Sequence, residues 1–208
     1  MAPIVTVTSA AMSRKFVEPS YARDMLGLSV SEISDQKLDN LIDGASALIE
    51  EWCGREGEMI RETISEQWRL RETKALIYLT RWPLVTITSI TEDDDDPLTA
   101  AYWEADYDRG YLYRLDGDDA RLAWDVKKLV VIYSAGYIAA DDTGANIPTA
   151  LRDATLEVLK SSWFALERDP YLRSEEVPGV AKYSYGFGAA AQSSFALSVD
   201  TAERLANY

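Results

Sequence analysis

The segment from Ser34 to Cys53 has the clearest helical pattern in the chain. Its apolar residues recur every three or four positions, which is the spacing of one face of a helix. These residues are Leu38, Leu41, Ile42, Ala45, Leu48, Ile49 and Trp52. Ser34 and Asp35 provide a capping start, and Gly54 allows the left-handed conformation that ends a helix. The pattern therefore predicts a helix over Ser34–Cys53.

Three other segments also have helical features. A short helix is predicted over Pro19–Leu26, before Gly27. Pro148 is tolerated in a first turn and opens a longer helix that stops at Asp169-Pro170. The predicted inward stripe of that helix is Leu151, Ala154, Val158, Leu159, Ser162 and Leu166. A short terminal helix is predicted within Phe195–Tyr208, through Leu197, Ala202 and Leu205.

The pattern changes to a two-residue period between Ile60 and Leu70. Polar residues occupy every second position there, namely Arg61, Thr63, Ser65, Gln67 and Arg69, which predicts a strand with one solvated face. Further short strands rich in branched and aromatic residues are predicted at Leu76–Leu79, Val85–Ile90, Tyr111–Leu115 and Leu129–Tyr133. Asp108-Arg109-Gly110 and Asp116-Gly117-Asp118 predict turns.

These elements predict an α+β fold that is mainly α-helical. We expect a small helical bundle with a β-hairpin layer and an extended C-terminal arm. Residues 1–18 form an N-terminal lead, residues 19–169 the core domain, and residues 170–208 the arm with a short terminal helix. The arm is assigned because Ser174–Ser194 is rich in Gly, Ala, Ser and Tyr and has no sustained period.

Composition narrows the range of functions. The 208 residues include no histidine and one cysteine, and the formal net charge is −14. Histidine-dependent serine triads and histidine-ligated zinc or iron sites are excluded, and Cys53 is predicted to be a small buried hydrophobe. A membrane span needs about 20 consecutive apolar residues, which the sequence lacks, so we expect synthesis in the cytoplasm and no membrane partner. The net charge of −14 disfavours tight binding of nucleic acid. It suits a conduit through which DNA slides without specific binding.

Acidic clusters are the most conspicuous chemical feature. The run Asp93–Asp96 lacks the alternating ligands, the glycine and the distal glutamate of a calcium loop, and we interpret it as an exposed hairpin tip. Asp116, Asp118 and Asp119 form a second cluster, and Asp106 with Asp108 a third. The prediction is no enzyme, with no catalytic, cofactor or metal site. A carboxylate-dependent hydrolase or a calcium-binding module stays open as an alternative.

The predicted arm carries aromatic residues spaced by two. Tyr183, Tyr185 and Phe187 would therefore point to one side of an extended segment, as in strand addition to a neighbouring protein. With Leu205 and Tyr208 of the terminal helix they are the predicted partner contacts.

The order of four segments carries a family resemblance. The segments are Ile49–Arg55 at a helix end, Ile77–Val85 leading into Ile87–Ile90, Val131–Tyr137 at a strand end, and Ile147–Ala154 opening a helix. This order resembles the head-tail connector, or adaptor, family of long-tailed phages and gene transfer agents. The resemblance covers roughly Pro19 to Arg168. The sequence departs from the family at Trp82, where a small or basic residue often precedes the proline.

The resemblance implies a structural subunit of a virion neck. Family members assemble as a ring of about a dozen copies under the portal protein, extend the DNA channel, and dock a stopper or tail-completion protein. No cofactor is implied. A tail-completion protein, or another neck protein, is the nearer alternative because it shares every compositional argument.

Overall fold

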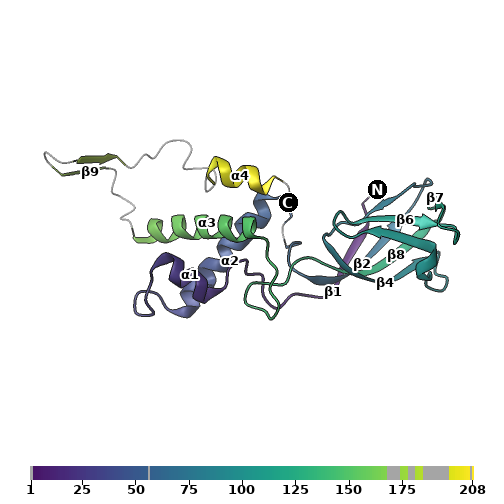
Figure 1. Cartoon of the computed structure of the whole chain (residues 1–208), viewed down its shortest axis with the longest axis horizontal. Coiled ribbons are helices and arrows are strands. Elements are labelled where there is room, and N and C mark those ends of the chain that lie inside the picture. Colours follow the sequence, from purple (N-terminus) through teal and green to yellow (C-terminus); the bar gives the residue numbers. More distant parts are fainter. Residues whose placement is uncertain (1, 56, 168–173, 178–180, 185–196, 207) are drawn as a thin grey trace. The chain divides into compact units, whose positions relative to one another are not determined.

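The computed structural model describes residues 2–55, 57–167, 174–177, 181–184, 197–206 and 208. The chain divides into two compact units, each built from two stretches of sequence (Figure 1). A β unit contains Met1–Arg14 and Arg55–Asn146, and a helical unit contains Lys15–Gly54 and Ile147–Tyr208.

The larger sheet of the β unit is antiparallel, with the strand order β1-β2-β8-β4. These strands are β1 (Ile4–Ser9), β2 (Glu62–Arg69), β8 (Lys128–Ala135) and β4 (Leu84–Glu92). Buried and partly buried residues alternate along the whole of β8, as expected for a central strand with a core on one face. All of β1 is exposed, which fits its place at the edge of the sheet.

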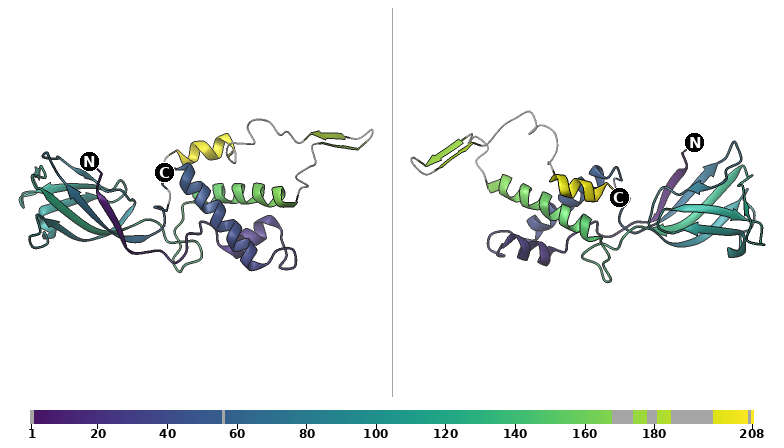
Figure 2. Two further views of the ribbon diagram at one scale, coloured as in Figure 1. Left: turned by 180° about the vertical axis from the view of Figure 1, so that it is seen from behind. Right: turned by 45° about the horizontal axis from the view of Figure 1, so that its top comes forward.

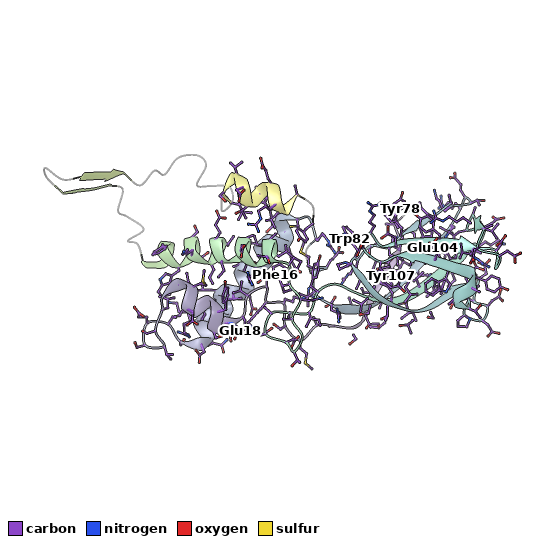
Figure 3. All side chains as sticks on the ribbon, in the orientation of Figure 1. Phe16, Glu18, Tyr78, Trp82, Glu104 and Tyr107 are labelled. Carbon is purple, nitrogen blue, oxygen red and sulfur yellow. The ribbon has the colours of Figure 1, made fainter. Side chains whose placement is uncertain are left out.

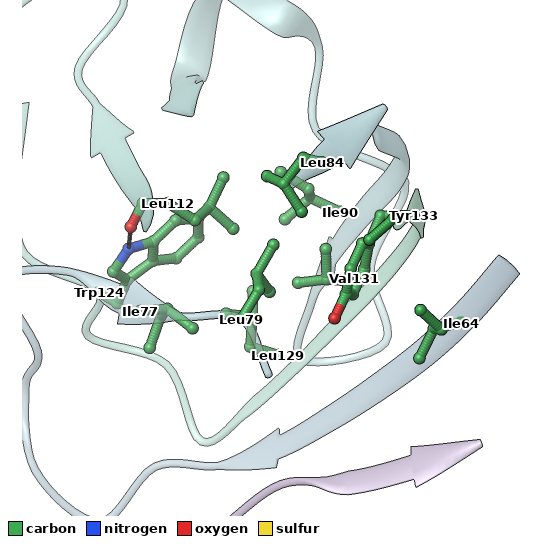
Figure 4. Close-up of a cluster of buried hydrophobic side chains, with 11 residues drawn as sticks. Ile64, Ile77, Leu79, Leu84, Ile90, Leu112, Trp124, Leu129, Val131 and Tyr133 are labelled. Carbon is green, nitrogen blue, oxygen red and sulfur yellow. Dashed lines mark hydrogen bonds between the residues drawn. The ribbon is translucent and has the colours of Figure 1, made fainter. Parts of the chain in front are cut away.

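The second sheet has the order β3-β6-β5, and β7 also pairs with β6. Its strands are β3 (Ile77–Tyr78), β5 (Trp103–Asp106), β6 (Tyr111–Leu115) and β7 (Arg121–Leu122), and a 3₁₀ turn, η1 (Ala100–Tyr102), precedes β5. Residues from both sheets form one core (Figure 4). They are Ile64, Ile77, Leu79, Leu84, Ile90, Leu112, Trp124, Leu129, Val131, Tyr133 and Ala135. The two sheets therefore fold as a single β unit.

The helical unit is formed by α1 (Pro19–Leu26), α2 (Asp35–Trp52), α3 (Thr149–Glu167) and α4 (Val199–Leu205) (Figure 2). Helix α2 packs against α3, and both α1 and α4 are attached to this pair. Leu38, Ile42 and Ile49 of α2 are buried in the core of the unit. A short antiparallel hairpin, β9 (Ser174–Val177) with β10 (Ala181–Ser184), lies between α3 and α4 in the sequence.

The prediction of a mainly helical fold is wrong. Of the described residues, about 30% are helical and 28% lie in strands, with two antiparallel sheets in the β unit. The strands do not form a hairpin layer on a helical bundle, because they enclose a core of their own around Trp124 and Tyr133. The strand content exceeds the prediction because β5 and β7 are only four and two residues long, and because β1, whose sequence alternates valine and threonine, lies in the segment expected to be an N-terminal lead.

The structure also bears on the predictions about membrane-spanning segments and about Cys53. Among the described residues, no helix has the length and apolarity needed to cross a membrane. Cys53 is partly rather than fully buried. It lies at the C-cap of α2, where its backbone N–H donates to the Ile49 carbonyl over 3.0 Å and the Gly54 N–H donates to the Glu51 carbonyl over 2.9 Å.

Candidate assembly surfaces and the residues that hold them

A buried ionic cluster lies at the start of β2. The carboxylate of Glu62 is 2% exposed, yet it accepts hydrogen bonds from two arginines. Arg14 Nη2 lies 2.6 Å from Glu62 Oε1, Arg81 Nη1 pairs with Oε2, and the Ala11 backbone N–H donates to Oε1 over 3.2 Å. One carboxylate thus connects the segment after β1, strand β2 and the segment before β4.

The second inward glutamate of β2, Glu66, is fully buried and accepts neutral donors. Its Oε1 accepts from the Tyr133 hydroxyl, the Thr80 hydroxyl and, over 2.9 Å, the Thr80 backbone N–H. Burial raises the pKa of Tyr133 far above its ordinary value, and the neighbouring Glu66 charge adds to the shift. Neither Glu62 nor Glu66 is open to a substrate, so both act by fixing the segment Thr80–Arg81 on the sheet.

Two residues of the family-like segments meet in the β unit. The Arg55 guanidinium lies 4.0 Å from the centre of the Trp82 ring, and its Nη2 donates to the Trp82 carbonyl. Arg55 is 4% exposed, so this cation–π contact is largely desolvated and correspondingly strong. Two of the segments that carry the resemblance are therefore in contact, through Arg55 and through Trp82, the position at which the sequence departs from the family.

Gly136, in the segment Val131–Tyr137, also has a structural requirement. Its φ is +103°, and an added Cβ would lie 2.7 Å from backbone atoms of Met59 and Ile60. The Tyr137 N–H donates to the Met59 carbonyl over 2.8 Å, and the Arg61 N–H donates to the Tyr137 carbonyl over 2.7 Å. Two backbones approach each other here, and only glycine fits between them.

The acidic clusters build turns. Asp93 Oδ1 accepts from the backbone N–H groups of Lys127 and Lys128 over 2.9 and 2.7 Å. Asp116 Oδ1 accepts from Asp118 and Ala120 N–H, and Asp106 Oδ1 accepts from Asp108 and Arg109 N–H. The run Asp93–Asp96 is exposed and follows β4 as a turn. Within the described residues, no three acidic, cysteine or histidine side chains are grouped so as to hold a metal ion.

Large apolar side chains are exposed on both units. On α2, Leu48 and Trp52 are 36% and 49% exposed, although the sequence pattern placed them on the inward face. On β1, Ile4 is 62% exposed, and in the described part of the chain no strand pairs with the outer edge of β1. Tyr78 and Tyr107 are exposed on the β unit (Figure 3). Large exposed apolar groups of this kind are typical of surfaces that are covered in an assembly.

The predicted partner contacts differ in how much the structure says of them. Tyr183 lies in β10, whereas Tyr185 and Phe187 fall outside the described residues. Leu205 is 1% exposed and anchors α4 within the helical unit. Tyr208 is partly buried, and its backbone N–H donates to the Leu205 carbonyl over 3.0 Å. The role of these five residues in partner contacts stays a prediction.

The signal for the ionic cluster was present in the sequence. Glu62 and Glu66 share the parity of Ile64 and Trp68, so the alternation of β2 places both carboxylates on the inward face. Glutamate is rarely buried without a partner, so two inward carboxylates also predict hydrogen-bond donors beside them. In the structure these donors include Arg14 and Arg81 for Glu62, and Tyr133 for Glu66.

Comparison with known proteins gives structural similarity alone. No family model and no curated protein matches the chain. A chain in the neck of an empty gene transfer agent particle, computed with C6 symmetry, matches with a TM-score of 0.56 and 18% identity, covering 97% of this chain and 94% of that chain. A chain in the virion of a native gene transfer agent particle matches with a TM-score of 0.53 and 18% identity, covering 84% and 89%. The fold of this chain is therefore one found in gene transfer agent particles.

Proposed function

We propose that the protein is a structural, non-enzymatic subunit of the neck of a tailed-phage or gene-transfer-agent particle, and that it acts as a head-to-tail adaptor. The observation that carries this proposal is the similarity of nearly the whole chain, 97% of it, to a chain in a gene transfer agent neck. The order of segments that resembles the adaptor family is independent support, because it was found in the sequence.

The proposed form is a ring of about a dozen copies below the portal protein. The matching neck was computed with six-fold symmetry, which a ring of twelve satisfies. The exposed side chains of Leu48 and Trp52 on α2, and of Ile4 on β1, are suited to contacts between copies or with a neighbouring neck protein. A stopper or tail-completion protein docks on the other side of the ring.

The ring extends the channel through which DNA passes. A net charge of −14 per copy provides an acidic lumen that repels phosphate and so offers no sites where DNA would stick. A reconstruction whose lumen is lined mainly by lysine and arginine would contradict this part of the proposal.

The test is negative-stain microscopy of the purified full chain mixed with the portal protein of the same particle. We expect a ring stacked on the portal, with the number of copies given by class averages. A chain that leaves the portal bare but binds the end of the tail tube would be a tail-completion protein instead. The free chain by itself decides little, since a portal can template the ring.

The role of the predicted C-terminal arm is tested with a separate substitution variant. A deletion of residues 174–208 would not be specific, because it would also remove the buried Leu205. Replacing Tyr183, Tyr185 and Phe187 by serine changes the predicted partner contacts and keeps α4. We expect weaker ring formation on the portal than with the unmodified chain, counted as ring-bearing portals in micrographs. Unchanged assembly of the arm variant would remove the arm from the proposal.

A further inference from the structure

The loop between β2 and β3 forms an unusually basic groove on this acidic protein. The groove has a volume of about 530 Å³, within the range of peptide and small-ligand sites. It is lined by Trp68, Arg69, Leu70, Arg71, Glu72, Lys74, Leu76, Ile77 and Tyr78. Three cations and one carboxylate therefore line it, on a chain whose net charge is −14.

The three cations are exposed and have no partner within the described chain. Arg69, Arg71 and Lys74 make no ion pair and no side-chain hydrogen bond with any described residue. Arg114 and Arg121 of the same unit are, by contrast, paired with Glu92 and Glu104. Three positive charges without an ion-pair partner among the described residues therefore line one groove.

The groove also has apolar walls. Ile77 is 2% exposed at its base, Tyr78 is 59% exposed, and Trp68 is partly buried against the core of the β unit. The Trp68 indole N–H is itself buried and has no acceptor among the described residues, so a ligand in the groove would contact the Trp68 ring rather than this N–H.

Backbone hydrogen bonds hold the groove in shape. The Leu70 N–H donates to the Lys127 carbonyl over 3.0 Å. Lys74 and Trp124 exchange two backbone hydrogen bonds of 3.1 and 2.7 Å, and the Trp124 side chain is fully buried. Both ends of the loop are therefore fixed to the core, and a ligand would bind without having to order it.

From this combination we propose that the groove binds an acidic peptide segment of a protein partner, with an apolar side chain seated against Trp68 and Ile77 and carboxylates facing Arg69, Arg71 and Lys74. Charge complementarity argues for a ligand rich in Asp and Glu. Nucleic acid is disfavoured because its affinity comes from many phosphate contacts, whereas the groove offers three cations on a strongly acidic protein.

The experiment is an NMR titration of the full chain labelled with ¹⁵N, which detects weak binding at a defined residue. The probe is the peptide acetyl-Asp-Glu-Leu-Phe-Glu-Asp-amide, and the neutral control peptide is acetyl-Asn-Gln-Leu-Phe-Gln-Asn-amide. The indole signal of Trp68 is identified among the six tryptophans with the variant Trp68→Phe. A short oligothymidylate tests nucleic acid in parallel.

We expect a saturable shift of the Trp68 indole signal with the acidic peptide alone, weakened by salt because exposed charges are screened. The triple variant Arg69→Gln, Arg71→Gln, Lys74→Gln should bind about tenfold more weakly. Arg109→Gln is the matched control, because it removes an exposed arginine that does not line the groove and should bind as the unmodified chain does.

Three results would overturn the proposal: no saturable shift at Trp68, equal binding of the neutral peptide, or tighter binding of oligothymidylate than of the acidic peptide. The last result would identify the groove as a nucleic-acid site. The titration uses the chain without a portal, so its failure leaves the proposed ring untouched.

Discussion

At the residue scale, the β unit depends on polar groups placed inside its core. Glu62 and Glu66 are both buried, and both connect β2 to the segment Thr80–Arg81 that precedes β4. Apolar packing is not directional, whereas each carboxylate accepts only from donors at defined positions. These hydrogen bonds therefore determine where the segment lies on the sheet, and single substitutions among them should have large effects.

Replacing Glu62 by glutamine should destabilise the β unit by about 3 kcal/mol, because Arg81 would keep a buried charge without its carboxylate. Arg14 is 41% exposed, so its charge stays partly solvated and its pair with Glu62 contributes less to this loss of stability. The free energy of unfolding is measured by urea denaturation. Glu104→Gln is the matched control, since its pair with Arg121 is exposed on both sides and should contribute about 0.5 kcal/mol or less. Equal effects of the two substitutions would mean that the Glu62 cluster is not buried as described.

Tyr133 gives the β unit a dependence on alkaline pH. Its pKa is raised above the ordinary value of 10.0 in the folded chain, first by burial and then by the Glu66 charge. The unfolded chain therefore loses this proton more easily, so the stability associated with Tyr133 is complete below about pH 10 and decreases above it. In Tyr133→Phe the unfolding free energy should start lower and fall less steeply above about pH 10. If the unfolding free energies of the unmodified chain and of Tyr133→Phe fell with the same slope above about pH 10, the pH dependence would not come from Tyr133.

Gly136→Ala should cost about 3 kcal/mol or more, because a Cβ would lie 2.7 Å from two backbone segments at a φ of +103°. The variant Gly57→Ala in the same unit separates the cost of the positive φ from the cost of the steric clash. Its φ is +67°, but the nearest atoms belong to the end of the Arg14 side chain, so the expected cost is about 1 kcal/mol. Thermal unfolding of both variants provides the comparison, and a mild effect at Gly136 would show that the two strand ends can separate.

At the element scale, the helices were predictable to within a residue or two. The prediction Ser34–Cys53 is confirmed by α2, whose Ser34 hydroxyl accepts from the Lys37 N–H, and Pro19–Leu26 by α1, which ends at Gly27 with a φ of +67°. Period and capping residues are local properties, so a sequence records them directly.

The strands were predictable where branched and aromatic residues are grouped, whether or not burial alternates along the strand. Tyr111–Leu115 is confirmed as β6, and Leu129–Tyr133 lies within β8. Strand β1 was missed although Val5 and Val7 alternate with Thr6 and Thr8, a pattern typical of a strand; all of its residues are exposed at the edge of the sheet. Trp52 shows the opposite error, since a residue on the apolar face of α2 is 49% exposed when the chain is considered alone. The basic groove was not predicted either: its lining is one continuous stretch of sequence, Trp68–Tyr78, whose charges can be read from the sequence but whose concave shape cannot.

Helix α4 is attached through a carboxylate on α3. Glu157 accepts from the Ser198 N–H over 2.7 Å and from the Thr201 hydroxyl over 2.6 Å. Burial alone would raise the pKa of Glu157, but the hydrogen bonds from Thr201 and Ser198 outweigh it and lower the pKa below 4.5. The attachment should therefore be complete above the ordinary pKa and be lost as the pH falls through the lowered value.

Glu157→Gln should loosen α4 at neutral pH, because the amide lacks the charge and one of the two acceptor oxygens. The α4 amide signals in an NMR spectrum report this, and in the unmodified chain they should change in the same direction on acidification. Asp153→Asn is the control, since its 3.5 Å pair with Arg204 is exposed and should contribute little. If Asp153→Asn loosens α4 as much as Glu157→Gln does, the loss of a negative charge on α3, and not the hydrogen bonds of Glu157, would explain the effect.

At the scale of the whole molecule, the net charge of −14 opposes the proposed assembly. Copies in a ring lie side by side, and their repulsion reaches over about 30 Å at 0.01 M salt but only about 8 Å at 0.15 M. Apolar contacts through residues such as Trp52 are not weakened by salt in this way. Ring formation on the portal should therefore increase between these two salt concentrations, counted as ring-bearing portals in micrographs.

Replacing Asp95, Asp96, Asp118 and Asp119 by asparagine reduces the net charge from −14 to −10. All four side chains are exposed and accept no hydrogen bond in the described chain, so the fold should be unaffected. If repulsion limits assembly, this variant should form rings at lower salt than the unmodified chain does. Rings that instead dissolve as salt increases would show that opposite charges on neighbouring subunits hold the ring, and the exposed apolar residues would then need another partner.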